Sequence, residues 1–488
     1  MDFRGKWSKW SKDSAVVFSS PVFLFVFLPI LLIIYWLSPY KIKNYILLLA
    51  SLLFYSWGEP RFILVVVVSV IIDFFLAKKI KKTEDKTKKG WLALSLVLNI
   101  GLLLYFKYAN FFVGNVRALY AYLGAQPFDW ADVALPIGIS FITFQKISYM
   151  VDVYRGTVEP QRKLTDLMLY ILMFPQLIAG PIVRYKEIAL QLTDRQATDT
   201  YARRVNGFFR FMVGLAKKVL IANVLAEYVD AVFAVSPDYM SSATAWVATL
   251  AYTFQIYFDF SGYSDMALGL GQMLGFRFPE NFNFPYISQS ITEFWRRWHI
   301  TLSSWIKDYL YIPMGGNRVP VPRMYFNLCF AFFISGLWHG AAWTFIIWGL
   351  YHGLFLVLDK IGMLKVLSKI GKLPSVVLTF FVAMIGWVIF RAESMAYAFS
   401  FLRKMFAFDG RYDEFYCDRR FWFVFALAVI FSFMGYFKKM ENIQYKIYTD
   451  NPTKRVLIGG TVLAVLLYIL CGGSLLAGGL NPFIYFRF

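Results

Sequence analysis

Apolar stretches without charged residues recur along the whole chain and alternate with shorter polar segments. A helix needs about 20 apolar residues to cross the hydrocarbon core of a bilayer. The pattern therefore predicts membrane-crossing helices near residues 18–38, 43–57, 61–77, 91–113, 134–151, 207–235, 244–262, 374–390, 421–437 and 456–477.

Two further apolar segments do not fit a simple crossing. The segment 164–183 contains Pro175 and Pro181 and has basic residues on both sides, which favours a broken, re-entrant hairpin. The run 325–358 would be roughly 51 Å long as one straight helix, against a hydrocarbon core of about 30 Å. It must tilt steeply or break, and the expected weak points are its glycines Gly336, Gly340 and Gly349.

In the segment 294–310 the apolar residues recur at helical spacing and do not form a continuous apolar run. One face of a helical template collects Trp295, Trp298, His299, Leu302, Trp305, Ile306 and Tyr309. The other face collects Arg296, Arg297, Ser304, Lys307 and Asp308. Tryptophan prefers the headgroup region and basic side chains reach lipid phosphates, so the pattern predicts one amphipathic helix near the membrane plane.

These patterns predict an all-α polytopic membrane protein with roughly 11 transmembrane helices plus re-entrant and interfacial amphipathic helices. Residues 1–16 are expected to form a polar N-terminal tail. Residues 17–488 are expected to form a single membrane domain, because no polar stretch is long enough to fold separately.

The composition supports a membrane protein and indicates which loops face the cytoplasm. The chain is 59% hydrophobic with a mean hydropathy of +0.54, which excludes an ordinary soluble domain. Its net charge of +20 indicates cytoplasmic loops that face anionic lipids, and not nucleic-acid binding. Seven lysines in the segment 78–89 form the strongest cytoplasmic marker, and we expect this segment to be a cytoplasmic loop. The three cysteines are scattered and the histidines lack metal-ligand spacing, so we predict no disulfide framework, no metal site and no bound cofactor.

The three histidines of the chain are His299, His339 and His352. His339 lies inside an apolar segment, where an ionisable side chain is costly and marks a functional site by default. The alternative is a packed helix in which His339 is purely structural. Its neighbours Trp338 and Gly340 are flat or small, which leaves room for a helix or a ligand to approach.

Several motifs identify a family. FWRRWHITLSSWIKDYLYIPMGGNR (Phe294–Arg318) followed by GLWHGAAWTFIIWGLYHG (Gly336–Gly353) resembles the membrane-bound O-acyltransferase family. The likeness is greatest to its alginate O-acetylation branch, which is related to the membrane protein of teichoic-acid D-alanylation. Further matching stretches are VFSSPVFLFVFLPI, FPQLIAGPIVRY, FDFSGYSDMALGLG, FPENFNFPY and NPFIYFRF, so the resemblance runs from Val17 to Phe488.

The resemblance implies an acyltransferase with His339 as its catalytic histidine and His299 as a second catalytic or positioning histidine. A neutral imidazole is a suitable general base for transfer of an acyl group from a thioester to a hydroxyl. His352 is expected to be structural. As substrate-binding residues we predict Trp338, Trp343, Trp298, Asn283, Asp265, Arg296 and Arg297. Ordinary turn, ion-pair or lipid contacts remain alternatives for Asn283 and its neighbour Asn281, for Asp265 and its neighbour Asp259, and for the arginines.

The resemblance also implies a function, a location and partners. We expect transfer of an acetyl group from acetyl-CoA or an acylated carrier protein for O-acetylation of an extracellular polysaccharide, at the bacterial cytoplasmic (inner) membrane. The expected partner is an exported or membrane-anchored polysaccharide acetyltransferase, and membrane lipids surround the protein. D-alanyl or peptidoglycan acyl transfer is an alternative within the class. A non-catalytic transporter or lipid-binding scaffold is the alternative from another class.

Overall fold

The computed structural model describes residues 17–126, 128–177, 180–410, 413, 415–449, 452–477 and 483. The polar tail expected at residues 1–16 lies outside the described residues. Within the described part every regular element is a helix, so the all-α prediction is confirmed.

The chain forms two compact units, and unit 1 comprises Met1–Thr198 and Phe276–Phe278. Its helices are η1 (Phe23–Phe27), α2 (Leu28–Leu37), η2 (Tyr40–Ile42), α3 (Lys43–Gly58), α4 (Ile63–Lys82), α5 (Asp85–Leu103), η3 (Leu104–Tyr108), α6 (Ala109–Tyr122), α7 (Ile139–Arg155), α8 (Leu164–Leu172), α9 (Phe174–Leu177), α10 (Tyr185–Thr193) and η4 (Gln196–Thr198).

Unit 2 comprises Asp199–Gly275 and Pro279–Phe488. Its helices are α11 (Tyr201–Ala216), η5 (Lys217–Ala222), α12 (Asn223–Phe233), η6 (Pro237–Tyr239), α13 (Ser242–Met273), η7 (Pro285–Ile287), α14 (Ile291–Arg297), α15 (Ile300–Ile306), η8 (Lys307–Tyr311), α16 (Val321–His339), α17 (Trp343–Leu358), η9 (Asp359–Met363), α18 (Leu364–Ile370), α19 (Lys372–Arg391), α20 (Met395–Met405), α21 (Arg419–Phe433), η10 (Met434–Tyr436), α22 (Lys438–Ile447) and α23 (Lys454–Ala477). The proposal of one membrane domain over residues 17–488 concerns how these units are assembled and stays a prediction.

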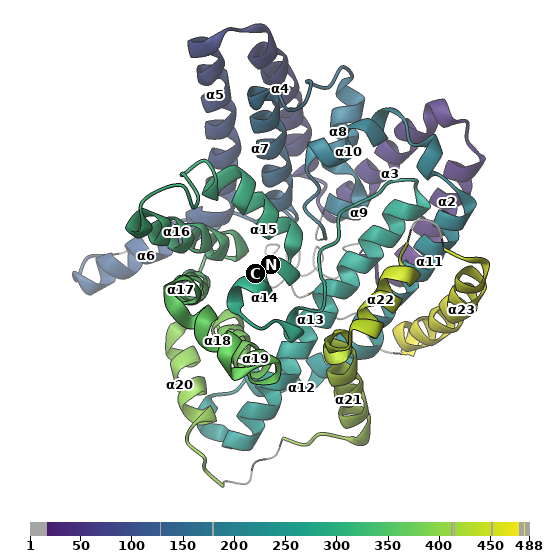
Figure 1. Cartoon of the computed structure of the whole chain (residues 1–488). Helices are drawn as coiled ribbons and strands as arrows, with labels where there is room; N and C mark the ends of the chain where they lie inside the picture. Colours follow the sequence, from purple (N-terminus) through teal and green to yellow (C-terminus); the bar gives the residue numbers. More distant parts are fainter. Residues whose placement is uncertain are drawn as a thin grey trace, which may run out of the picture. The chain divides into compact units, whose positions relative to one another are not determined.

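In unit 1, α4, α5 and α7 lie side by side (Figure 1), and these three helices share a buried polar cluster. The carboxylate of Asp73 on α4 accepts hydrogen bonds from Ser95 (2.8 Å) and Asn99 (3.1 Å) on α5. Lys146 Nζ on α7 lies 3.2 Å from the same carboxylate, and both side chains of this ion pair are at most 4% exposed. A charge buried among apolar helices is stable only when it is paired and hydrogen-bonded, so this cluster fixes the register of three helices.

The lysine-rich segment 78–89 is not the loop that its charge suggested. Helix α4 continues to Lys82 and α5 begins at Asp85, so only Thr83 and Glu84 separate the two helices. Lysine has a good helix propensity, and several lysines occupy the last turn of α4, where positive charge favours the helix dipole.

The side of the membrane on which this turn lies can be tested with cysteine labelling. In a background without the three native cysteines, we expect Thr83→Cys to resist a membrane-impermeant thiol reagent in intact cells and to react after permeabilisation, because lysine-rich ends stay in the cytoplasm. Asp238→Cys, at an exposed turn that the crossings predict to be outside, serves as the labelled control. Ready labelling of Thr83→Cys in intact cells would reverse the predicted topology.

The segment 164–183 is broken, as its prolines predicted. Helix α8 spans only Leu164–Leu172 and is followed by the one-turn helix α9. A helix of this length is roughly 14 Å long, which is too short to cross a hydrocarbon core of about 30 Å. The re-entrant placement of this segment stays a prediction.

Unit 2 is organised around α13, whose 32 residues are almost all buried. Helix α11 packs against it at two reciprocal glycine pairs, Gly207 with Gly269 and Gly214 with Gly262. A Cβ atom on Gly207 would lie 2.7 Å from Gly269 O, and one on Gly214 would lie 2.5 Å from Gly262 O. The missing side chains let the two backbones touch, which is a common way for membrane helices to associate.

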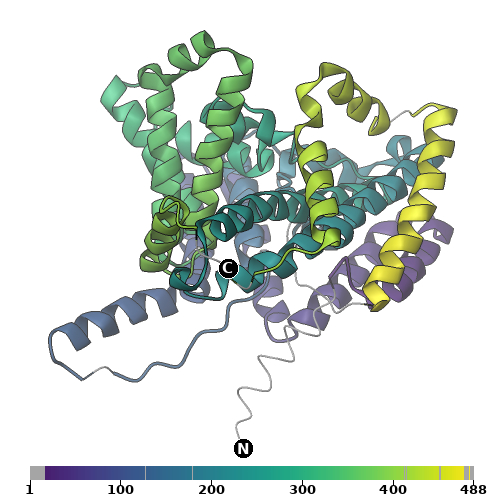
Figure 2. The ribbon, with the colours of Figure 1, turned by 90° about the horizontal axis from the view of Figure 1, so that it is seen from below.

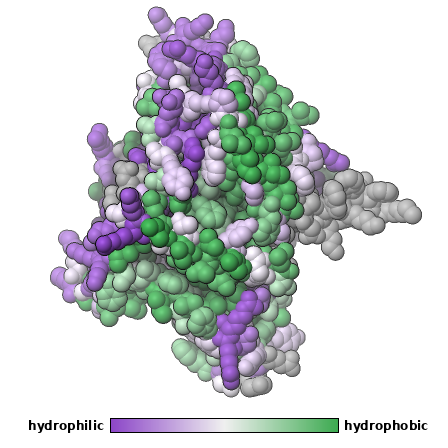
Figure 3. Space-filling model, turned by 90° about the vertical axis from the view of Figure 1, so that its right-hand side faces the viewer, coloured by the Kyte–Doolittle hydropathy of each residue, from purple (hydrophilic) through white to green (hydrophobic). Residues whose placement is uncertain are grey.

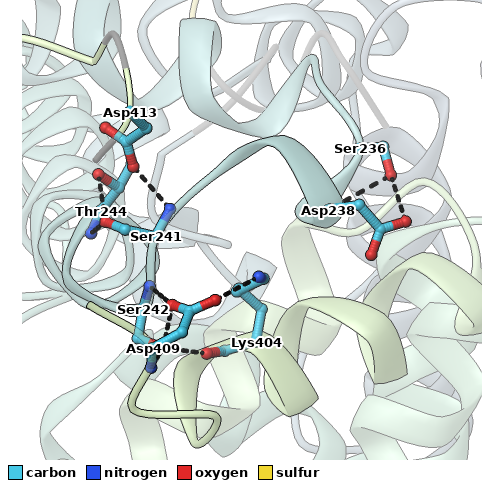
Figure 4. A network of polar contacts seen from close by, with 8 residues as sticks. All are labelled: Ser236, Asp238, Ser241, Ser242, Thr244, Lys404, Asp409 and Asp413. Atoms are coloured by element: carbon cyan, nitrogen blue, oxygen red, sulfur yellow. Dashed lines mark hydrogen bonds and ion pairs between the residues drawn. The ribbon is translucent and has the colours of Figure 1, made fainter. Parts of the chain in front are cut away.

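The amino end of α13 is held by two aspartates from the segment that follows α20 (Figure 4). Asp409 accepts hydrogen bonds from Ser242 N (2.9 Å) and pairs with Lys404 (2.8 Å), while Asp413 accepts from Ser241 N (2.6 Å). The Lys404 hydrogen bond, helped by the Ser242 N–H, lowers the pKa of Asp409 to about 2, so this carboxylate is ionised at neutral pH. Negative charge at a helix amino end complements both its free N–H groups and its dipole.

The surface has the apolar character that a membrane requires. Figure 3 shows apolar side chains covering a broad area of one face, with polar side chains gathered towards its edges. Five helices of the described part are long and apolar enough to cross a membrane: Lys86–Tyr122, Trp343–Ile370, Lys372–Arg391, Arg419–Tyr436 and Lys454–Ala477. Near the carboxyl end, the short helix α22 connects α21 to α23 (Figure 2). The chain is thus a polytopic membrane protein, whereas the number of 11 crossings stays a prediction.

Candidate active site

His299 lies in a break between two short helices. The expected single helix over 294–310 is wrong, because α14 ends at Arg297 and α15 begins at Ile300. Between them Trp298 is extended and His299 has a φ of +44°, in the left-handed region. A residue other than glycine adopts this conformation only when its surroundings impose it.

The segment that imposes the break contains both asparagines of the FPENFNFPY motif. Asn283 N donates to Arg297 O (2.9 Å), and Ile300 N donates to Asn281 O (3.0 Å). These two bonds satisfy backbone groups that a continuous helix would have paired internally. The hydrophobic periodicity correctly identified the buried stripe, but it could not reveal the separate segment that contains Asn281 and Asn283.

The side chain of Asn281 orients the imidazole of His299. Asn281 Nδ2 donates to Ser264 Oγ on α13 (3.0 Å), and its Oδ1 accepts from Thr301 Oγ1 (2.8 Å). Oδ1 also lies 3.0 Å from His299 Nδ1. Because Oδ1 is an acceptor, Nδ1 carries the proton and the lone pair of a neutral imidazole is placed on Nε2. His299 is fully buried, and within the described part no hydrogen-bond partner reaches Nε2.

His339 is the last residue of α16, at the tip of a helical hairpin. The run 325–358 breaks at Gly340, one of the three predicted weak points, and α17 begins at Trp343. The other two, Gly336 and Gly349, are not breaks but the points where α16 and α17 touch. A Cβ on Gly336 would lie 2.2 Å from Phe345 O, and one on Gly349 would lie 2.3 Å from Phe332 O.

Aromatic rings connect the histidines. The Trp338 ring contacts two of them, with its centroid 5.8 Å from that of His299 and 5.0 Å from that of His339. Trp348 and Phe390 meet the His339 ring edge to face at 5.0 and 5.3 Å. His339 is only 5% exposed, so the structure places two buried histidines in contact with one buried indole.

His352 lies behind this pair. Its ring contacts Trp348 at 5.1 Å and Trp295 at 5.0 Å, and it is fully buried. A Cβ on Gly386 of α19 would lie 2.8 Å from His352 Nε2, so α19 closes over this ring. The contacts describe a packed side chain that supports Trp348.

Phe483 also packs against the aromatic residues that surround His299. The buried ring of Phe483 stacks on Tyr263 of α13 at 4.7 Å and lies 6.0 Å from Phe260. Phe260 in turn meets His299 edge to face at 4.7 Å. The NPFIYFRF motif contains Phe483, but nothing in the sequence indicated this contact.

The other predicted substrate-binding residues are distributed differently. Trp298 is buried against Trp387 at 4.7 Å, and Asn283 contributes its backbone to the break. Asp265 is occupied by ion pairs with Arg210 (2.9 Å) and Lys217 (2.6 Å) on the α11–η5 side of α13. Trp343, the first residue of α17, is 55% exposed.

Arg296 and Arg297 lie on the face of α14 opposite to Trp295. Arg297 Nε pairs with Glu293 Oε1 (2.9 Å), whereas Arg296 is exposed. Within the described part no group of three or more histidine, cysteine or acidic side chains is arranged to hold a metal ion.

Residues 22–366 match the model of the MBOAT, membrane-bound O-acyltransferase family. The chain belongs to the membrane-bound O-acyltransferase family. It is therefore a membrane-embedded O-acyltransferase, and its histidines His299 and His339 lie in unit 2 among buried aromatic rings.

Individual relatives of this acyltransferase include several polysaccharide-modifying proteins. The chain is 47% identical over 395 residues to the probable alginate O-acetylase AlgI of Azotobacter vinelandii, which covers 80% of this chain and 78% of that protein. It is 38% identical over 429 residues to the peptidoglycan O-acetyltransferase of Helicobacter pylori, covering 81% and 80%. It is 31% identical over 232 residues to the teichoic acid D-alanyltransferase of Bacillus subtilis, covering 45% and 58%.

Proposed function

We propose that this membrane-bound O-acyltransferase moves an acetyl group from a cytoplasmic thioester, acetyl-CoA or an acylated carrier protein, for O-acetylation of an extracellular polysaccharide. The observation that carries the proposal is the pair of buried histidines, each at a chain break and each in contact with Trp338. The identity to alginate O-acetylases supports acetyl as the acyl group and a polysaccharide as the final acceptor. The bacterial cytoplasmic (inner) membrane is the proposed location.

In the proposed reaction His339 is the general base. The acceptor hydroxyl oxygen attacks the thioester carbonyl carbon while His339 takes the hydroxyl proton. The tetrahedral intermediate then collapses, the C–S bond breaks, and the proton passes from the imidazolium to the thiolate. The imidazole is neutral before and after each turnover, so the reaction needs no external proton donor.

His299 is proposed to position the substrates. With its Nδ1 proton held by Asn281, its Nε2 lone pair can accept a hydrogen bond from a second O–H or N–H group of the substrates, while the proton of the attacking hydroxyl goes to His339. The Trp338 indole, which contacts both imidazoles, excludes water from the thioester, which otherwise hydrolyses.

The test is a transfer assay with the full chain, purified and reconstituted in lipid nanodiscs. We expect radiolabelled acetyl-CoA or acetyl-carrier protein to lose its acetyl group only when a hydroxyl acceptor is present. Acceptors to compare are the exported acetyltransferase expected as the partner, alginate oligosaccharides and peptidoglycan fragments. Transfer to peptidoglycan alone would favour the acceptor of the Helicobacter pylori relative, and no transfer from any thioester would contradict the proposal.

A further inference from the structure

Glu280 directly precedes the asparagine that orients His299, and it forms an ion pair with a buried arginine. Arg210 of α11 is 3% exposed, and its Nη1 and Nη2 donate to Glu280 Oε1 (2.7 Å) and Oε2 (2.6 Å). Two parallel hydrogen bonds between a guanidinium and a carboxylate fix the orientation of both groups as well as their distance. The ion pair therefore holds the side chain of residue 280 in one direction against α11.

The guanidinium of Arg210 is itself held from two other sides. Its Nε and Nη2 donate to Asp265 Oδ1 on α13 at 3.1 and 2.9 Å, and it lies 4.4 Å from the centroid of the Tyr448 ring. The other oxygen of Asp265 pairs with Lys217 (2.6 Å). The charges of Lys217, Asp265, Arg210 and Glu280 alternate and sum to zero, which is the condition for burying the arginine. We call these four residues the charge ladder.

Two consecutive residues of α13 hold two consecutive residues of the FPENFNFPY motif. Ser264 Oγ accepts from Asn281 Nδ2 directly (3.0 Å), and Asp265 holds Glu280 through Arg210. One hydrogen bond alone would let Asn281 turn about it, whereas a second attachment at the preceding residue removes that freedom. The two attachments together fix the direction of Asn281 Oδ1.

The direction of Asn281 Oδ1 decides which nitrogen of His299 carries the proton. Oδ1 lies 3.0 Å from His299 Nδ1, so the proton of a neutral imidazole stays on Nδ1 and the lone pair stays on Nε2. If the amide turned and presented its Nδ2 donor, the lone pair would be needed on Nδ1 and the proton would move to Nε2. His299 could then no longer accept a hydrogen bond from a substrate through Nε2.

We propose that Glu280 and Arg210 are positioning residues for acyl transfer, which act on His299 through Asn281. Glu280 is 54% exposed, and Arg210 keeps Asp265 as a partner when Glu280 is replaced. Replacement of Glu280 should therefore loosen the segment around Asn281 without leaving a buried charge unpaired. This inference rests on the proposed function, because it names what holds a histidine of the same site.

The first test is a double-mutant cycle in the transfer assay. Glu280→Gln keeps the size of the side chain and removes its charge. We expect it to lower kcat about 10-fold, less than the 10²-fold that a misplacement of 1 Å can cost, and to leave the KM of the thioester donor unchanged. In an Asn281→Ala background the same change should have no further effect, because the side chain through which Glu280 acts is absent. An unchanged kcat for Glu280→Gln, or additive losses in the double variant, would overturn the proposal.

The second test observes the proton of His299 without any turnover. The chain contains three histidines, so the ring nitrogens of ¹⁵N-histidine-labelled protein in lipid bilayers give few NMR signals, which the variants His339→Ala and His352→Gln assign. We expect His299 to carry its proton on Nδ1 in the wild type and to populate both tautomers in Glu280→Gln. A Glu280→Gln protein whose His299 keeps the proton on Nδ1 would overturn the proposal even if its activity were lower.

Glu159→Gln is the matched control. It removes a carboxylate from an ion pair of 2.7 Å with Lys81 in unit 1, which contains none of the three histidines. Both kcat and the tautomer of His299 should stay as in the wild type. An equal loss of kcat for Glu159→Gln would show a general effect of charge and would contradict the role of the charge ladder. If the wild type transferred no acyl group, the proposed function would fail, whereas the tautomer measurement would still decide whether Glu280 orients His299.

Discussion

His339→Ala is expected to lower the turnover of acyl transfer by about 10²–10⁴-fold, the usual contribution of a positioned general base. His339 acts only on the hydroxyl proton in the transition state. Its removal should therefore change donor binding little and should lower mainly kcat. The measurement is single-turnover transfer from a labelled thioester, together with size-exclusion behaviour and melting of the purified variant.

Variants of the other two histidines serve as comparisons for His339→Ala. His352→Gln keeps a side chain of similar size behind Trp348 and should stay within a few-fold of the wild type, because His352 is separated from His339 by that ring. The turnover of His299→Ala should lie between those of His339→Ala and His352→Gln if His299 only positions the acceptor. It should equal that of His339→Ala if both histidines take part in proton transfer. A folded His339→Ala protein that still transfers acyl groups at the wild-type rate would show that the histidine is structural.

Gly336→Leu is expected to prevent the α16–α17 hairpin from closing and to remove most of the folded protein. A Cβ there already overlaps Phe345 O at 2.2 Å, and the clash is with backbone, which cannot rotate away. Overpacking costs typically about 1–3 kcal/mol and more where backbones must separate. This is a large part of a total stability of about 5–15 kcal/mol. Yield of monodisperse protein and its melting midpoint would be measured.

Gly101→Leu provides the matched control for the hairpin. Gly101 also lies within an apolar helix, but nothing comes within 4 Å of a Cβ at that position. Leucine has a better helix propensity than glycine, so this variant should be at least as stable as the wild type. Equal losses for the two variants would mean that the close contact at Gly336 does not hold the hairpin together.

Much of the helical architecture could be predicted because long apolar runs have few alternatives in a membrane. A break in the run 325–358 could also be predicted, since the run is too long for one crossing, but the sequence did not single out Gly340 among the three glycines Gly336, Gly340 and Gly349. In contrast, the lysines of 78–89 suggested a loop where the structure has two helix ends. Charge reports which side of a membrane a segment occupies, and not its backbone conformation.

The candidate site could be predicted only in part. His299 and His339 follow from their rarity and their motifs, but the break at Trp298–His299 depends on hydrogen bonds from Asn281 and Asn283, which lie in a separate segment. A periodic stripe describes which side chains are buried and cannot show whether the backbone between them is continuous. The exposure of Trp343 could not be predicted either, because it depends on the direction of the bend between α16 and α17.

The stacking of Phe483 on Tyr263 has a consequence for biogenesis. Residues from Phe260 to Phe390 provide both histidines, the orienting asparagine and the connecting rings, so most of the site can assemble while later helices are still on the ribosome. Phe483 is translated after all of these residues, and its ring packs against Tyr263 and against Phe260, which touches His299. This contact beside His299 is thus made only after residue 483 has been synthesised, later than the residues that form the rest of the site.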